Sequence, residues 1–320
     1  MIKNIIKFSG LVAILVFCAA SMFFSLIHRE LRTSQLKSTL AYPSFFEDKF
    51  YDWRMSKGLR HGIKDKRIVL AQIDDPSLKK IGRWPFSRSI WAKVINKLQN
   101  YGAKVIAFDV FFSEPEDQVM GKNPDEEMAN AILSFEKLKG RSVVLPFGAD
   151  IPGDAPLPTL PPALIDSMLK SKTKVNIDLH EGHLAQSVFP INSLLAAGPA
   201  LGLIKAEKDY DGIFRNYPLV INLQGQYYPS FALAAVDAFK EKKSIVNILD
   251  QEEKYLINDV SKFDINLKGE TKIRWLGGAV AFETIPLWKI LEASDHDVQM
   301  IKLLQDHIVF IGSTAYSAHD

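Results

Sequence analysis

The chain reads KVIAFDVFF at residues 104–112, a run that after Lys104 is apolar except for Asp109. A strand with one exposed face would alternate apolar and polar residues, and this run does not alternate. The pattern therefore predicts a strand covered on both faces, as in a parallel sheet. Because parallel strands are joined by crossover connections, helices are expected before and after it.

Two further elements are predicted on the amino-terminal side of this run. Residues 67–73 (RIVLAQI) form a second short apolar run, which ends before Pro76 because proline cannot continue a central strand. A helix is expected between Ser87, a suitable N-cap, and Gly102, which favours a left-handed stop. Strand, helix and strand in this order make a βαβ unit.

The carboxyl-terminal side continues the alternation of strands and helices. We expect residues 201–204 and 217–223 to form two strands joined by a turn at Asp211-Gly212. The other predicted elements are a helix at 124–139, a strand at 142–146, a helix after Ser230, a helix at 287–291 and a final strand at 307–311. The predicted fold is α/β, with a mixed, largely parallel sheet flanked by helices and preceded by one transmembrane helix.

The amino terminus contains twenty residues without a formal charge, between Lys7 and His28. This length suits a helix crossing about 30 Å of hydrocarbon, so residues 5–27 are predicted to span a membrane. A cleaved signal peptide is the alternative. The predicted organisation is a cytoplasmic end at 1–4, the span, a membrane-proximal helical linker at 28–59 and a folded domain at 60–320.

The linker contains a helical pattern over residues 36–57, in which Phe46, Phe50 and Trp53 are interleaved with charges. This spacing is typical of an amphipathic helix. Packing against a domain and contact with lipid are both compatible with it.

Charge and cysteine content exclude several classes of protein. The 39 basic and 37 acidic residues leave a formal charge of +2, too small to indicate a nucleic-acid partner. Cys18 is the only cysteine, so neither an internal disulfide nor a cysteine-rich metal site can form. We predict no cofactor.

Short motifs follow one another along the chain: DDPSL at 74–78, IGRWP at 81–85, IAFDVFFSEP at 106–115, DGIFR at 211–215, YPSFALA at 228–234 and VFIGST at 309–314. In this order they resemble the second type of CHASE domains, extracellular sensors associated with cyclases and kinases. The resemblance covers residues 45–320.

The resemblance implies a membrane-bound receptor. Members of this family typically place one membrane helix before an extracytoplasmic sensor, followed by further membrane helices and a cytoplasmic output domain. That domain is commonly an adenylate or guanylate cyclase, with a protein kinase as the alternative, and any such activity would belong to a longer parent chain. Residues 28–320 would lie outside the cytoplasm. The implied partners are the lipid bilayer, an unidentified small-molecule or protein ligand, and a second copy of the chain in a homodimer.

Three carboxylates are predicted near the carboxyl ends of two strands, where ligands bind in parallel sheets. Asp74 and Asp75 end the first strand, and Asp109 lies near the end of the second. Together with Glu114 they are candidates for holding a cation, although no metal is assigned. Turn formation and helix capping are the alternative roles.

A second group of candidates is basic and aromatic. Arg83, Trp84 and Arg88 are suited to an anion site, with guanidinium groups beside an aromatic wall. Alternatively, Arg83 pairs with Asp75 or Asp109 and fixes the loop. The predicted function is a sensor, and the competing hypothesis is a stand-alone, metal-dependent envelope hydrolase.

Overall fold

The computed structural model describes residues 41–58, 65–118, 121–150, 174–175, 181–182, 186–205, 207–223, 226–242, 245–248, 255–257, 261–263, 265–266, 268–276 and 281–315. The chain divides into two units. One includes the helix α2 (Ala41–Gly58), and the other includes the sheet and its helices.

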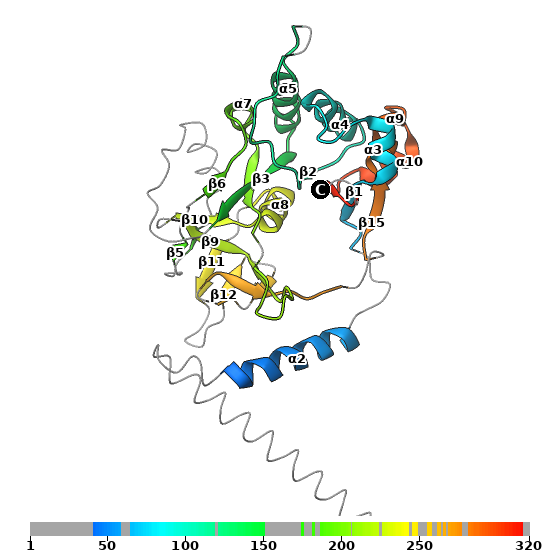
Figure 1. The fold of residues 1–320 in the computed structure, drawn as a ribbon. Coiled ribbons are helices and arrows are strands. Elements are labelled where there is room, and N and C mark those ends of the chain that lie inside the picture. Colours follow the sequence, from blue (N-terminus) through cyan, green and yellow to red (C-terminus); the bar gives the residue numbers. More distant parts are fainter. Residues whose placement is uncertain are drawn as a thin grey trace, which may run out of the picture. The chain divides into compact units, whose positions relative to one another are not determined.

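A parallel sheet forms the centre of the larger unit (Figure 1). Six strands pair in the order β15-β1-β16-β2-β3-β7, and every pair among them is parallel. Their bounds are β15 Glu283–Pro286, β1 Ile68–Ile73, β16 Ile308–Ser313, β2 Val105–Phe108, β3 Ser142–Asp150 and β7 Ala200–Leu203. The strand β6 (Gln186–Val188) pairs antiparallel with the end of β3. The predicted α/β class with a largely parallel sheet flanked by helices is confirmed.

Smaller sheets lie downstream of β3 in the chain. They combine β10, β9 and β5, then β13, β12, β11 and β4, and finally β14 and β8. The bounds are β4 Lys174–Val175, β5 Glu181–Gly182, β8 Asn216–Pro218, β9 Val220–Leu223, β10 Gln226–Pro229, β11 Ile245–Ile248, β12 Tyr255–Ile257, β13 Ser261–Phe263 and β14 Glu270–Lys272.

The strand β2 has the burial that its sequence predicts. All four residues from Val105 to Phe108 are buried, which requires cover on both faces of the sheet. The strand is shorter than the apolar run at 104–112 because the register with β16 ends at Phe108. Beyond that point Phe112 is buried in the core, whereas Phe111 stays 44% exposed.

Helices cover the two faces unequally. Among the described helices, six pack against one face of the sheet in a single core, and α8 (Phe231–Lys240) covers β2 and β3 on the other face. The helices of the larger face are α3 Asp75–Ile81, α4 Arg88–Asn100, α5 Pro124–Glu136, α7 Asn192–Ala196, α9 Leu287–Glu292 and α10 Val298–Leu304. Ser87 caps α4 and Ser230 caps α8, as the sequence predicts.

One glycine permits α8 to approach the sheet. A Cβ atom on Gly202 of β7 would lie 2.4 Å from the Cα of Phe231 and 3.0 Å from the Cβ of Ala234. No side chain fits in that space without moving the backbone. The close contact between β7 and α8 therefore depends on glycine at this position.

The predicted hairpin between residues 201–204 and 217–223 is wrong. The first segment becomes β7, which pairs parallel with β3, while β8 pairs with β14 and β9 with β10. The turn at Asp211-Gly212 does form, with the Gly212 amide donating to the Asp209 carbonyl at 2.9 Å. Three successive residues of β7, Leu201–Leu203, are buried. Continuous burial is typical of strands in a parallel sheet, whereas a hairpin strand usually alternates buried and exposed residues.

The last of the described strands, β16, occupies an inner position. β16 pairs with β1 on one side and with β2 on the other, so the predicted βαβ unit is split by a strand from the far end of the sequence. Its Ile308 packs toward α8 and its Val309 toward the larger set of helices.

A helix is present in part of the predicted linker, but its apolar residues do not gather strongly on one face. α2 runs from Ala41 to Gly58, with Phe50 and Trp53 both more than half exposed. The predicted membrane span at 5–27 lies outside the described residues. Among the helices that are described, none combines the length and the apolar character needed to cross a bilayer.

We expect Gly202→Ala to lower the free energy of unfolding by at least about 1–3 kcal/mol, the usual cost of overpacking, because the new methyl group would meet the backbone of α8. Gly148→Ala is the matched control, since its methyl group would make only ordinary contacts of 3.5 Å or more. Urea unfolding of the two variants measures the difference. Equal stability would show that α8 does not pack closely on β7.

Candidate functional site

A cleft of about 550 Å³ lies at the carboxyl edge of the parallel sheet, and three of the predicted site residues line it: Arg83, Arg88 and Glu114. One wall is the connection between α3 and α4, and the other is the loop that follows β2. Its lining residues are Ile81, Gly82, Arg83, Pro85, Phe86, Ser87, Arg88, Ile90, Phe111, Ser113, Glu114, Pro115 and Glu116. A volume of this size is typical of small-molecule sites.

Arg88 joins the two walls of the cleft. Its Nη2 donates to the Glu114 carbonyl oxygen at 2.8 Å, and its backbone amide donates to Glu116 Oε2 at 2.7 Å. Its Nε lies 3.7 Å from Asp125 Oδ1, and both side chains are about nine-tenths buried. The Glu116 amide in turn donates to Asp125 Oδ2 at 3.0 Å. The charge of Arg88 is thus engaged within the protein, where it positions the loop after β2.

Asp125 is the functional neighbour that the sequence reasoning missed. It lies in the first turn of α5, after the N-cap Asn123, where acidic residues are common because they complement the helix dipole. That local role gave no reason to connect it with Arg88. Its burial beside an arginine would be visible only in three dimensions.

Trp84 belongs to the core that supports the cleft and is not among the lining residues. Its ring meets Phe86 and Trp91 edge-on, with centroids 5.3 and 6.4 Å away. Trp91 continues the cluster to Phe108 and Phe112. These edge-to-face contacts hold the α3–α4 connection against the sheet.

Arg83 and Glu114 have free charged groups. Arg83 is exposed, and neither its guanidinium nor the Glu114 carboxylate makes a hydrogen bond or an ion pair with any of the described residues. The expected pairing of Arg83 with Asp75 or Asp109 is therefore not found. Arg83 lies on the cleft instead, and its charge remains available to a ligand.

Asp74 and Asp75 are part of the start of α3. The Ser77 amide donates to Asp74 Oδ1 at 2.9 Å, and the Ser77 hydroxyl donates to the same atom at 2.5 Å. Asp75 lies in the first turn of that helix. Asp74 thus has the capping role that we considered as the alternative. The structure does not bring either residue into the lining of the cleft.

Asp109 lies on the α8 side of the sheet, away from the cleft. A Cβ on Gly312 of β16 would lie 3.4 Å from Asp109 Oδ2, so glycine leaves space for the carboxylate. Solvent reaches this group, but the surrounding protein displaces enough water to raise the pKa of the carboxyl above its usual range. No hydrogen bond or ion pair to its side chain occurs among the described residues.

Tyr217 is a neighbour of Asp109. Burial raises the pKa of the Tyr217 hydroxyl, and the nearby negative charge of Asp109 adds to that shift, while hydrogen bonds from Ser230 and the Ala232 amide oppose it. Ser230 is fully buried as the N-cap of α8. Among the described residues, the Asp109 carboxylate thus lies beside a polar hydroxyl and has no paired partner. It does not join Asp74, Asp75 or Glu114 in a common site.

The cation hypothesis gains no support from the described residues. Among them, no three His, Cys, Asp or Glu side chains lie close enough together to hold a metal ion. The carboxylates of Asp74, Asp109 and Glu114 are divided between a helix cap, the α8 side of the sheet and the cleft.

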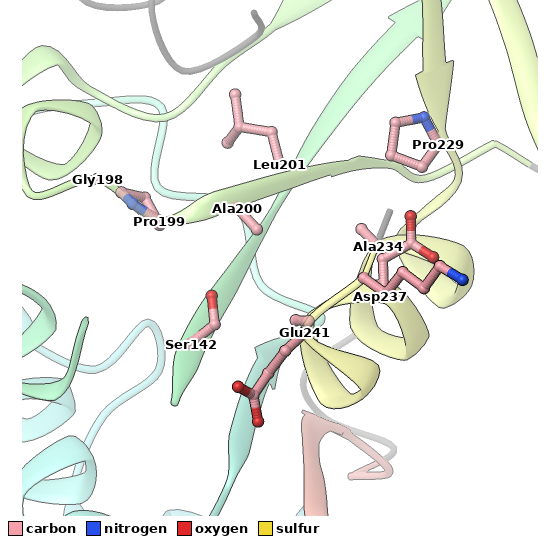
Figure 2. Close-up of a pocket in the computed structure, with 11 residues that line it drawn as sticks. Ser142, Gly198, Pro199, Ala200, Leu201, Pro229, Ala234, Asp237 and Glu241 are labelled. Atoms are coloured by element: carbon pink, nitrogen blue, oxygen red, sulfur yellow. The ribbon is translucent and has the colours of Figure 1, made fainter. Parts of the chain in front are cut away.

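A second hollow of about 280 Å³ lies where β7 meets α8. Figure 2 shows its lining, which comes from the start of β3, from β7, and from α8 with Pro229 nearby. The surface is mainly apolar. The charged groups at its rim are engaged, because Glu241 pairs with Lys104 at 3.0 Å and both Asp237 and Lys242 have partners. The cleft beside Arg83, with two free charges, is the better candidate for ligand recognition.

We expect Asp109→Asn to raise the melting temperature near neutral pH. A folded-state pKa above the unfolded value means that the ionised carboxylate costs stability at higher pH, and that the cost disappears once the group is protonated. The difference between variant and wild type should therefore shrink as pH falls from about 7 toward 4. Thermal unfolding across this range measures it. A variant that melts lower at neutral pH would reveal a stabilising partner for Asp109.

Comparison with known families identifies the chain. No curated protein and no solved structure matches it. A match to the CHASE2 domain covers residues 23–320, which includes the whole parallel sheet and both walls of the cleft. The chain belongs to the CHASE2 domain family.

Proposed function

We propose that this chain is the extracytoplasmic input portion of a transmembrane receptor and that it binds a small molecule in the cleft beside Arg83. The family supports a sensor, because CHASE2 is an extracellular sensor domain. The cleft itself is the main support for this binding site. Its volume of about 550 Å³ and the unpaired charges of Arg83 and Glu114 suit ligand recognition.

The path of the strands suggests how binding could be transmitted. One wall of the cleft follows β1 and α3, the other follows β2, and β16 lies between those two strands. A ligand that touches both walls would favour one relative position of β1 and β2. The signal would be the difference in ligand affinity between two such arrangements.

The membrane and the output are further parts of the proposal. Residues 5–27 would anchor the domain, and residues 28–320 would lie outside the cytoplasm. The signal would pass to a cyclase in a longer parent chain, with a protein kinase as the alternative and dimerisation as one means of coupling. A stand-alone metal-dependent hydrolase has no comparable support, because the described acids do not assemble into a metal site.

We expect an alkaline phosphatase fused after residue 320 to be active in bacterial cells, because the enzyme folds only after export. A β-galactosidase fused at the same residue should be inactive. Both activities are measured in whole cells expressing the full chain. The opposite pair of results would place the domain in the cytoplasm and contradict the proposed receptor.

We expect Ser113→Trp to abolish ligand binding without unfolding the protein. Ser113 is exposed and lines the cleft, so an indole at this position would fill the space that a ligand needs. Ser294→Trp is the matched control, because Ser294 is an exposed serine after α9 and outside the cleft. A thermal-shift screen of the full chain against small extracellular metabolites supplies the ligands. Hits that bind both variants equally would show that the cleft is not the sensor site.

A further inference from the structure

The charges that line the cleft balance. Among the lining residues that the structure describes, two arginines and two glutamates contribute, so their formal charges sum to zero. Arg88 and Glu116 are used inside the protein, because Arg88 Nη2 donates to the Glu114 carbonyl and the Arg88 amide donates to the Glu116 carboxylate. One cation, on Arg83, and one anion, on Glu114, remain without partners among the described residues.

The two free charges come from opposite walls. Arg83 belongs to the connection between α3 and α4, and Glu114 belongs to the loop after β2. They are not within ion-pair distance of one another. Apolar groups also face the cleft, including Ile81, Ile90 and the ring of Phe111, which is 44% exposed.

The position of Phe111 is set by the structure. Its ring lies over Gly148 in the last part of β3. A Cβ atom on Gly148 would be 3.5 Å from the ring carbon Cε1 of Phe111 and 3.7 Å from the Cβ of Val188. The preceding strand is fixed by its register with β16, and the following Phe112 is buried. The exposed ring is therefore held as an apolar surface at the edge of the cleft.

We propose that the cleft binds a small zwitterion, with a carboxylate on Arg83, an ammonium group on Glu114 and an apolar body against Phe111. This inference rests on the proposed sensor function and names the ligand class of the same cleft. A guanidinium is suited to a carboxylate because its parallel N–H donors match the two oxygens. Free amino acids and short peptides share this chemistry.

Ligands with one charge match the cleft less well. A carboxylic acid without an amine would shield Glu114 from water and offer no cation in return, and an amine without an acid would do the same to Arg83. Leaving a charged group shielded and unpaired is costly, so a site with both signs rejects analogues that lack one of them.

The test compares four probes that share the same isobutyl group. L-Leucine is a free amino acid, leucyl-leucine is a short peptide, isocaproate lacks the amine and isoamylamine lacks the acid. Binding to the full chain is measured by titration calorimetry at neutral pH. We expect leucine or the dipeptide to bind about tenfold or more tightly than either singly charged analogue, because each lost charged contact changes affinity by at least that factor. The tighter of the two zwitterions identifies the source.

Two variants assign the charges. Arg83→Gln should bring the affinity for the zwitterion down to that for isoamylamine, and Glu114→Gln should bring it down to that for isocaproate. Arg83→Lys keeps the charge and should restore part of the binding. Arg67→Gln and Glu292→Gln are matched controls on exposed ion pairs outside the cleft, and they should bind like the wild type.

The zwitterion assignment and the proposed sensor function fail on different results. Equal or tighter binding of isocaproate or isoamylamine, or zwitterion binding that survives both cleft variants, would overturn the zwitterion assignment. Failure of all four probes would overturn it as well. A ligand of another charge class that binds the wild type but not Ser113→Trp would still support a sensor cleft. If neither a zwitterion nor a ligand of another charge class binds in the cleft, both the zwitterion assignment and the proposed sensor site are contradicted.

Discussion

The architecture depends on the burial of β2 on both faces. Val105 and Ala107 face α8, while Ile106 and Phe108 face the larger set of helices, so neither face can be left to water. This explains why α8 must pack tightly and why Gly202 brings β7 so close to it. The same sheet ends at the carboxyl edge, where β1 and β2 lead into the two walls of the cleft.

Arg88 determines what the cleft offers to a ligand. Its contacts with the Glu114 carbonyl, the Glu116 carboxylate and Asp125 engage one arginine and two acids within the protein. Arg83 and the Glu114 carboxylate remain free because they lie beyond this cluster. The neutral balance of the site thus results from the division between charges that shape the loop and charges that face outward.

The main strands and their helices could be predicted from local patterns. A few neighbouring residues are enough to recognise the apolar runs of β1, β2 and β16. The same holds for the helix caps Ser87 and Ser230. Pairing across the sheet could not be predicted in this way. Nothing near residue 308 indicates that β16 enters between β1 and β2, and the turn at Asp211-Gly212 favoured a hairpin that the parallel sheet overrides.

The candidate site was predicted in part for the same reason. Arg83 and Arg88 follow β1 and Glu114 follows β2, and the carboxyl edge of the sheet brings all three to one cleft, whereas Asp109 points to the α8 side because alternate residues of a strand face opposite ways. The direction of a side chain depends on the register, which a motif does not contain. Asp125 was missed because its contact with Arg88 joins two different helices.

The inner position of β16 has a consequence for how the protein is made. Until the ribosome has supplied residues 308–313, β1 cannot be bridged to β2, and the middle of the sheet is missing. Until then, the apolar surfaces of the earlier strands stay exposed to water. The central pairings join residues far apart in the sequence, and we therefore expect folding to be slow. Until β16 is made, the exposed apolar surfaces of the nascent chain are prone to aggregation, the hazard that chaperones counter.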